Sequence, residues 1–296
     1  MELRVLEYFL AIAREETISK AAEFLHITQP TLSRQMKDLE DELGKSLFIR
    51  GNRKITLTKD GMLLRKRAEE IVSLVEKTEA EMLADDAVLS GDIFIGSGET
   101  DSMRLIAKVI HQIKQDHPHL KFHLYSGNAE DVTDRLDKGL IDFGILIEPA
   151  DVSKYDFIKM PTTDVWGVLM RKDDPLAALS TITPKDLMNK PLICSTQRAV
   201  ENEIAGWFGR NHKHLNITTT YNLIYNASLL VEEQGEYALS LDKLINTSGD
   251  SPLCFRPLEP RLEVNLNLVW KKYQIFSKAS EYFLDQIREE FSKYSK

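Results

Sequence analysis

Apolar and polar positions alternate with a helical period through the first 45 residues, which predicts three short helices. The first covers 3–13 and the second covers 18–25. Thr28 is placed to cap the third, and Pro30 stands in its first turn, where the missing N–H of proline costs nothing. Gly44 is a suitable C-terminal stop. The inward face of the third helix repeats at a 4-3-4 spacing through Leu32, Met36, Leu39 and Leu43.

Two short apolar runs, 48–50 and 54–57, flank a Gly-Asn-Arg turn and predict a β-hairpin. A long helix is predicted to follow over 60–86. Its apolar positions alternate at 4-3 spacing, as in the seam of a coiled coil, through Gly61, Leu64, Ala68, Ile71, Val75, Thr78 and Met82. Such a seam favours pairing with the same helix of a second subunit. The alternative is an amphipathic helix that lies on its own chain.

From residue 92 onward, short apolar runs alternate with helical stretches, which predicts a mainly parallel α/β sheet. This alternation occurs twice, so two lobes joined by a connection around 164–183 are the simplest architecture. The predicted strands are 93–95, 121–125, 143–147, 192–194, 218–223, 237–240, 253–256 and 266–270; the predicted helices are 103–115, 130–138, 200–211, 227–234 and 277–294. The predicted domains are 1–59, a linker at 60–90, and 91–296, with lobe I at about 91–163 and 266–296 and lobe II at about 164–265.

Composition adds a local charge signal and excludes several classes of protein. The chain of 296 residues has a formal net charge of −8, yet between Gly44 and Lys59 it carries basic residues and no acid. Such a segment indicates a polyanionic partner more directly than the total charge does, although a solvated basic hairpin has the same composition. Cys194 and Cys254 form no C-x-x-C pattern, so neither a disulfide framework nor a zinc site is expected. The N-terminus lacks a signal-peptide pattern, and no apolar run reaches the roughly 18 residues of a membrane helix, so we expect a cytoplasmic protein without membrane contact.

The second and third predicted helices have the spacing of a helix-turn-helix motif, at about 18–37. With its apolar side buried, the third helix exposes a polar N-terminal end. Helix N–H groups there can meet phosphate, and Gln and Ser side chains can reach base edges in the major groove. The residues on this end are Gln29, Pro30, Thr31, Ser33, Arg34 and Lys37. Double-stranded DNA is therefore the predicted partner.

The run AAEFLHITQPTLSRQMKDLE, at 21–40, closely resembles the LysR-type transcriptional regulators. The segments ELGKSLFIR at 42–50 and LTKDG at 57–61 match the next block of that family, and GDI at 91–93, GLIDF at 139–143 and DPL at 174–176 agree further along. The resemblance thus spans the whole chain and is most specific over about the first 65 residues.

The resemblance implies an N-terminal all-α winged helix-turn-helix, a long dimerising linker helix, and a C-terminal α/β effector domain of two lobes, similar to periplasmic binding proteins. It also implies a homodimer or homotetramer that regulates transcription, with RNA polymerase as a possible partner and no enzymatic activity. Its DNA contacts fall on Gln29, Pro30, Thr31 and Ser33 in the groove, on Arg34 and Lys37 near phosphates, and on Arg50, Arg53 and Lys54 in the wing. For Thr31, a helix cap is the alternative role.

The resemblance further implies a small polar metabolite as effector, bound between the lobes. Hydroxyl, amide and helix-terminal N–H groups on both walls suit such a ligand. The candidate contacts are Ser97, Glu99, Thr100, Asp101, Ser102 and Asn128 on one wall and Ser195, Thr196, Arg198 and Asn226 on the other. Glu99 and Asp101 depart from the family pattern, so a zwitterion or an amine-bearing ligand is as plausible as a simple acid. Arg198 is either the partner of an anion or an exposed surface arginine.

Other functional classes have weaker support in the sequence. The chain contains no Walker-type, GxSxG or HExxH motif, and neither a cofactor nor a metal is predicted. The histidines between His111 and His123 fit a surface loop better than a metal site. Two alternatives remain: a LysR-type regulator without a small-molecule effector, and a solute-binding protein, which would have no use for the first 86 residues.

Overall fold

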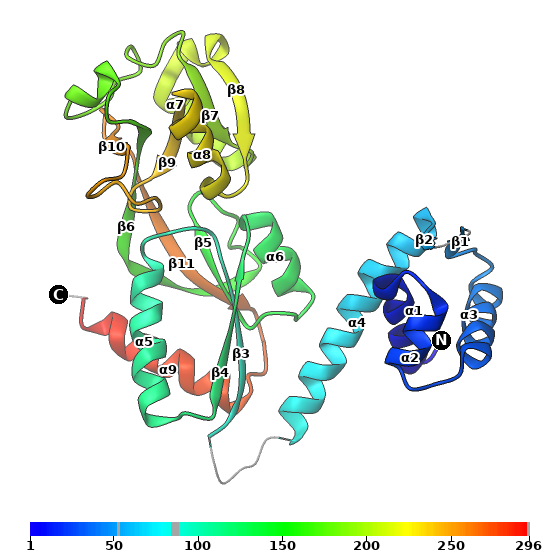
Figure 1. Ribbon diagram of the computed structural model, residues 1–296. Helices are drawn as coiled ribbons and strands as arrows, with labels where there is room; N and C mark the ends of the chain where they lie inside the picture. The colour runs from blue at the N-terminus through cyan, green and yellow to red at the C-terminus, as the bar shows by residue number, and fades with distance from the viewer. Residues whose placement is uncertain (52–53, 84–88, 295–296) are drawn as a thin grey trace. The chain divides into compact units, whose positions relative to one another are not determined.

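The computed structural model describes residues 1–51, 54–83 and 89–294. The chain divides into two compact units, Met1–Leu83 and Ala84–Lys296 (Figure 1). Each unit has a hydrophobic core of its own. Within the described ranges, no helix is long and apolar enough to cross a membrane.

The N-terminal unit packs short helices around a small core. In chain order it contains α1 (Leu3–Glu15), α2 (Ile18–Phe24), α3 (Gln29–Leu43), the hairpin strands β1 (Phe48–Arg50) and β2 (Ile55–Leu57), and α4 (Lys59–Leu83). The hydroxyl of Thr28 caps α3 by accepting from the Thr31 N–H at 3.4 Å, and Gly44 ends the helix at a left-handed φ of 63°. Leu32, Met36 and Leu39 of α3 are buried, whereas Leu43, predicted to face inward with them, is 39% exposed at the last residue of the helix. The three predicted helices and the hairpin are confirmed.

The structure divides the predicted seam of α4 into two parts. Leu64 and Ala68 lie in the core of the N-terminal unit, where α4 packs against α1. Ile71 is 39% exposed and Met82 is 80% exposed. The interpretation of the whole stripe as an intersubunit seam is therefore wrong for its first half, because a repeat of seven does not distinguish a partner in the same chain from one in another. Of the predicted helix, 84–86 lie outside the described residues.

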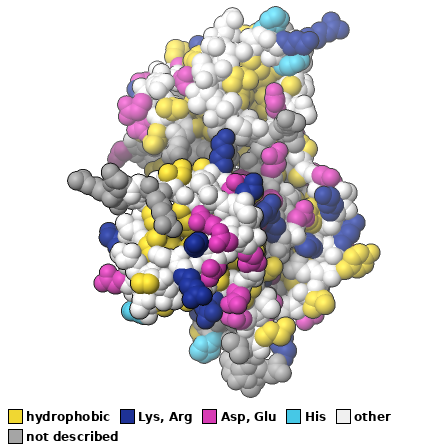
Figure 2. Space-filling view, turned by 90° about the vertical axis from the view of Figure 1, so that its right-hand side faces the viewer, with side chains coloured by type: hydrophobic (Ala, Val, Ile, Leu, Met, Phe, Trp, Pro, Cys, Tyr) yellow, Lys and Arg dark blue, Asp and Glu magenta, His cyan; other side chains and the backbone are white. Residues whose placement is uncertain are grey.

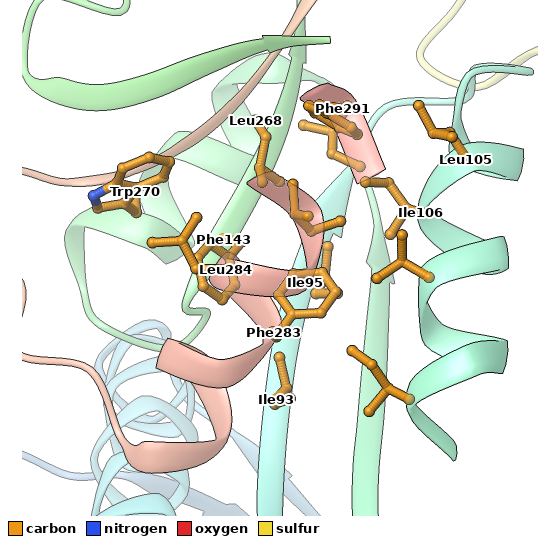
Figure 3. Close-up of a cluster of buried hydrophobic side chains, with 14 of the residues drawn as sticks. Ile93, Ile95, Leu105, Ile106, Phe143, Leu268, Trp270, Phe283, Leu284 and Phe291 are labelled. Carbon is orange, nitrogen blue, oxygen red and sulfur yellow. The ribbon is translucent and has the colours of Figure 1, made fainter. Parts of the chain in front are cut away.

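Lobe I of the C-terminal unit is a parallel sheet covered on both faces. Its strands β3 (Gly91–Ser97), β4 (Leu120–Ser126) and β5 (Phe143–Ile147) are parallel, with β3 in the middle. Helices α5 (Met103–Asp116) and α9 (Lys278–Ser292) pack on one face, in the core that Figure 3 shows around Phe143 and Phe283. Helix α6 (Ala129–Asp137) covers the other face through Val132 and Leu136.

Lobe II repeats this arrangement with its own strands and helices. The strands are β7 (Pro191–Ser195), β8 (Asn216–Tyr221), β9 (Tyr237–Leu241) and β10 (Leu253–Pro257), and the helices are α7 (Arg198–Phe208) and α8 (Ile224–Gln234). Two short 3-10 helices, η1 (Pro175–Ala178) and η2 (Gly209–His214), complete it. β7 is parallel to both β8 and β9. The strands predicted for both lobes are confirmed, with ends that differ by a few residues.

Two long strands run between the lobes, and one of them was not predicted. β6 (Tyr155–Arg171) pairs antiparallel with β11 (Glu263–Lys271). At one end β11 also pairs with β5 of lobe I, and at the other end β6 pairs with β9 and β10 of lobe II. The sheet order is β4-β3-β5-β11-β6-β9-β7-β8, with β10 on β6. The predicted connection over 164–183 is wrong for its first part, because 164–171 continue strand β6.

Candidate nucleic-acid interface and interlobe site

Helix α3 presents a polar end that its own packing holds in place. Leu32 and Met36 anchor one side in the core, and the opposite side leaves Gln29, Arg34 and Lys37 exposed. Pro30 and Thr31 are exposed too, and Ser33 is half-buried. These six of the side chains predicted to contact DNA therefore project from a capped helix rather than from a loop.

Three of these side chains have partners that bear on their roles. The Ser19 hydroxyl donates to Gln29 Oε1 at 3.3 Å, which orients the amide of Gln29 and leaves its NH₂ group to donate outward. The Thr31 and Thr28 hydroxyls lie 2.8 Å apart, so Thr31 takes part in the helix cap, the alternative raised from the sequence. Arg34 Nε lies 3.9 Å from the Asp38 carboxylate, a long and exposed pair that holds the guanidinium weakly.

The wing is tied to the end of α1. Lys54 Nζ pairs with the carboxylate of Glu16, and the Ile55 N–H donates to the Glu16 carbonyl oxygen at 2.8 Å. The Lys54 ammonium lowers the pKa of Glu16, through a hydrogen bond first and charge attraction second. Lys54 therefore positions the hairpin as well as exposing a charge. Arg53 lies outside the described residues, as does the side chain of Arg50.

The face of the molecule that Figure 2 shows carries charges of both signs. In the view of Figure 2, Lys and Arg side chains lie beside Asp and Glu side chains and form no broad basic face. Binding to a polyanion would therefore rest on particular residues at the end of α3 and in the wing, and not on the net field of the chain, whose formal charge is −8.

The loop after β3 is fastened to the interlobe strand β6. The Thr100 hydroxyl donates to Asp164 Oδ2 at 2.5 Å, and the Ser102 hydroxyl donates to Asp164 Oδ1 at 2.8 Å. These three side chains are buried. Burial raises the pKa of Asp164, and the two hydroxyl hydrogen bonds offset only part of that rise. Sequence reasoning missed Asp164, because it lies in the strand that the hydropathy pattern did not predict.

The two acids of this loop reach across to lobe II. The backbone N–H of Ile224, the first residue of α8, donates to Glu99 Oε2 at 2.5 Å. Asp101 lies 3.7 Å from Lys243 Nζ of lobe II and 2.5 Å from Arg104 Nε of its own lobe. Burial raises the pKa of Glu99, and the hydrogen bond from Ile224 opposes that rise. Neither Lys243 nor Ile224 was singled out from the sequence.

The predicted wall of lobe II meets lobe I through Gln197, which stands in the predicted loop between Thr196 and Arg198 but was not among the predicted contacts. Gln197 Oε1 accepts from the Ala129 N–H at 3.3 Å, across the lobes, and the Gln197 N–H donates to the Ser195 hydroxyl at 3.3 Å. Next to Ala129, the Asn128 side chain caps α6 by accepting from the Asp131 N–H at 2.9 Å.

The remaining predicted effector contacts are placed as follows. The Ser97 hydroxyl donates to the Gly98 carbonyl oxygen at 2.7 Å. Thr196 and Asn226 are exposed. Arg198 begins α7, and its side chain lies outside what the structure describes.

Two pockets open beside the loop at 97–102. One, of about 410 Å³, is lined by Ser97, Glu99, Asp101, Leu124 and Lys243, among others. The other, of about 340 Å³, shares Asp101 and Lys243 with the first and also reaches Asp164 and Lys108. Both pockets join residues of the two lobes and place carboxylates close to ammonium groups. The predicted contacts Ser195, Thr196 and Asn226 are not among the residues that line them.

Models of known protein families match both units of the chain. The model for "Bacterial regulatory helix-turn-helix protein, lysR family" matches residues 3–62, and the model for "LysR substrate binding domain" matches residues 86–292. The "Uncharacterized HTH-type transcriptional regulator YvbU" of Bacillus subtilis is 29% identical over 98% of this chain and 99% of its own length. The HTH-type transcriptional regulator BsdA of the same organism is 33% identical over 71% of this chain and 73% of its own.

Solved structures show the same fold at lower identity. Full-length CbnR complexed with its target DNA has a TM-score of 0.75 at 17% identity, covering 99% of this chain and 100% of CbnR. HinK, a LysR family transcriptional regulator from Pseudomonas aeruginosa, has a TM-score of 0.56 at 22% identity, covering 99% of each chain.

Proposed function

The chain belongs to the LysR family of bacterial transcriptional regulators, and we propose that it reads operator DNA with the N-terminal end of α3 and responds to a small polar effector held between its lobes. The observation that carries the DNA-binding part is that Gln29, Arg34 and Lys37 are exposed on a helix whose other side is fixed in the core, with Ser33 half-buried beside them. Rigid placement matters, because a base contact must hold its geometry to discriminate between sequences.

Within this proposal the residues have different tasks. Gln29 and Ser33 carry amide and hydroxyl groups that read base edges, whereas Arg34 and Lys37 carry charges that meet phosphates. Thr31 serves mainly the cap of α3, given its contact with Thr28. Lys54 pairs with Glu16 and, in this proposal, also meets a phosphate of the DNA.

Arg34→Ala should weaken binding to all duplex sequences together, because a phosphate contact carries no direct sequence information. The slope of log K against log salt concentration should fall in magnitude by about one unit, since roughly one counterion fewer is released on binding. Titration of a labelled duplex at several salt concentrations measures both effects. Glu23→Ala, at an exposed position of α2, is the control. An unchanged salt slope for Arg34→Ala would remove its phosphate role.

For the effector, support comes from the two pockets beside the loop at 97–102, which join groups of both lobes. A ligand there acts only by its different affinity for two arrangements of the lobes. CbnR, the relative solved with its target DNA, has the same two-unit fold. We further propose that the exposed part of α4, from Ile71 to Met82, joins two copies of the chain, so that two α3 helices address two half-sites.

A further inference from the structure

Glu99 of lobe I is hydrogen-bonded to the first residue of helix α8 in lobe II. Its carboxylate accepts the N–H of Ile224, 125 residues away in the chain and in the other lobe. Glu99 is half-buried, in the loop that leads from β3 to α5. The negative group thus lies where the two lobes approach each other.

Helix α8 has no acceptor of its own at this end. Its N-cap residue is Leu223, which carries no polar side chain and makes no capping hydrogen bond. The first N–H groups of an α-helix need an acceptor from outside the helix, and the helix dipole favours a negative one. Glu99 supplies that acceptor from the opposite lobe.

Two further contacts cross between the lobes. Asp101 faces Lys243 at 3.7 Å, and the Ala129 N–H donates to Gln197 at 3.3 Å. The larger pocket is lined by Glu99, Asp101 and Lys243. The two cations that line this pocket, Lys243 and Arg104, both pair with Asp101, whereas the Glu99 carboxylate is bound to the first N–H of α8.

We propose that Glu99 determines the charge of the effector: its carboxylate, tethered to lobe I and bound to α8 of lobe II, takes the position that a carboxylate of the ligand would otherwise fill. The effector then presents an uncharged or cationic group, such as a hydroxyl or an amine, to this part of the pocket. This inference rests on the proposed effector site. It follows from like-charge repulsion beside Glu99, since the N–H of Ile224 already has an acceptor and Lys243 and Arg104 already pair with Asp101.

The test is whether removal of Glu99 opens a position for a free carboxylate. In the full chain, sodium formate is titrated at constant ionic strength against sodium chloride, and the Tm of the C-terminal unit is followed. Glu99→Ala should show a saturable rise in Tm with formate, whereas the wild type should show none. Glu99→Gln keeps a side-chain oxygen that accepts from Ile224, so it should also show none.

Glu130→Ala is the matched control. Glu130 is also an acid of lobe I, but it is exposed, in the first turn of α6. It should give no formate response. The same response to formate in all four proteins, or no response of Glu99→Ala up to concentrations that saturate weak carboxylate sites, would overturn the proposal. This measurement involves neither DNA nor the natural effector. A failure of the Glu99 proposal can therefore be told apart from a failure of the proposed DNA binding, which the salt dependence of Arg34→Ala tests separately.

Discussion

Ile71→Asp should convert the chain to monomers and abolish high-affinity DNA binding. Ile71 is 39% exposed and Leu74 is 42% exposed on α4, although both are large and apolar, which fits a surface that a second copy covers. An aspartate buried there without a partner would destabilise the dimer by about 3–5 kcal/mol. Sedimentation velocity measures the loss of the dimer, and titration of a duplex with two half-sites measures the loss of binding.

Ser73→Asp is the matched control, because it places the same charge at an exposed position on another side of α4. It should leave both assembly and DNA binding unchanged. If Ile71→Asp gave a dimer of undiminished stability, the exposed part of α4 would not be an interface between copies. Leu64 is unsuitable for this test, since it packs against the core of the N-terminal unit and its substitution would destabilise that unit as well.

Asp164→Ala should destabilise the C-terminal unit by about 2–6 kcal/mol, because two buried hydroxyls lose their acceptor and each such loss costs about 1–3 kcal/mol. The hydroxyls are those of Thr100 and Ser102. Denaturant unfolding followed by Trp fluorescence measures the change. An effect within about 0.5 kcal/mol, as for an ordinary surface substitution, would show that this network does not fasten the loop to β6.

Asp164→Asn removes the titration of this side chain and keeps its shape, but it keeps only one of the two acceptor oxygens. The pH dependence of the stability difference, and not its size, therefore reports on the charge. The pKa of Asp164 is raised above its usual 3.8 by burial. A carboxyl with a raised pKa in the folded state contributes stability that is fully present below its usual pKa and is lost as the pH rises through the raised value. The stability of the wild type relative to Asp164→Asn should therefore fall as the pH rises above about 4. A difference that stays constant with pH would contradict the raised pKa.

The N-terminal unit could be predicted in detail because its signals are local. Thr28, Pro30 and Gly44 mark the ends of α3 within its own sequence, and the buried residues follow a helical period. The exposure of the recognition side follows from that period alone. The helical period could not predict which surface α4 packs against. Ala68 and Ile71 belong to one repeat, yet Ala68 is buried and Ile71 is exposed.

The interlobe site depends on contacts that no local pattern records. β6 was missed because Pro161 and the polar run at 162–164 interrupt its apolar pattern, while its pairing with β11 joins residues about a hundred positions apart. The partner of Glu99 is a backbone N–H, which every residue but proline carries, so sequence alone cannot identify it. Glu99 was predicted from the sequence as a residue of the effector site. Its hydrogen bond to α8 could be found only from the folded structure.

The central claim is that the N-terminal end of α3 reads DNA sequence, and selection from a library of random duplexes tests it most directly. The full chain and its Gln29→Ala variant are each used to enrich bound duplexes, which are then sequenced. We predict that the wild type enriches a pair of related half-sites. The variant should lose preference at one position in each half-site, worth about 1–3 kcal/mol, and keep the others. If Gln29→Ala enriched the same half-sites with the same preference at every position, α3 would not read bases through Gln29; if the wild type enriched no sequence at all, the central claim would be wrong.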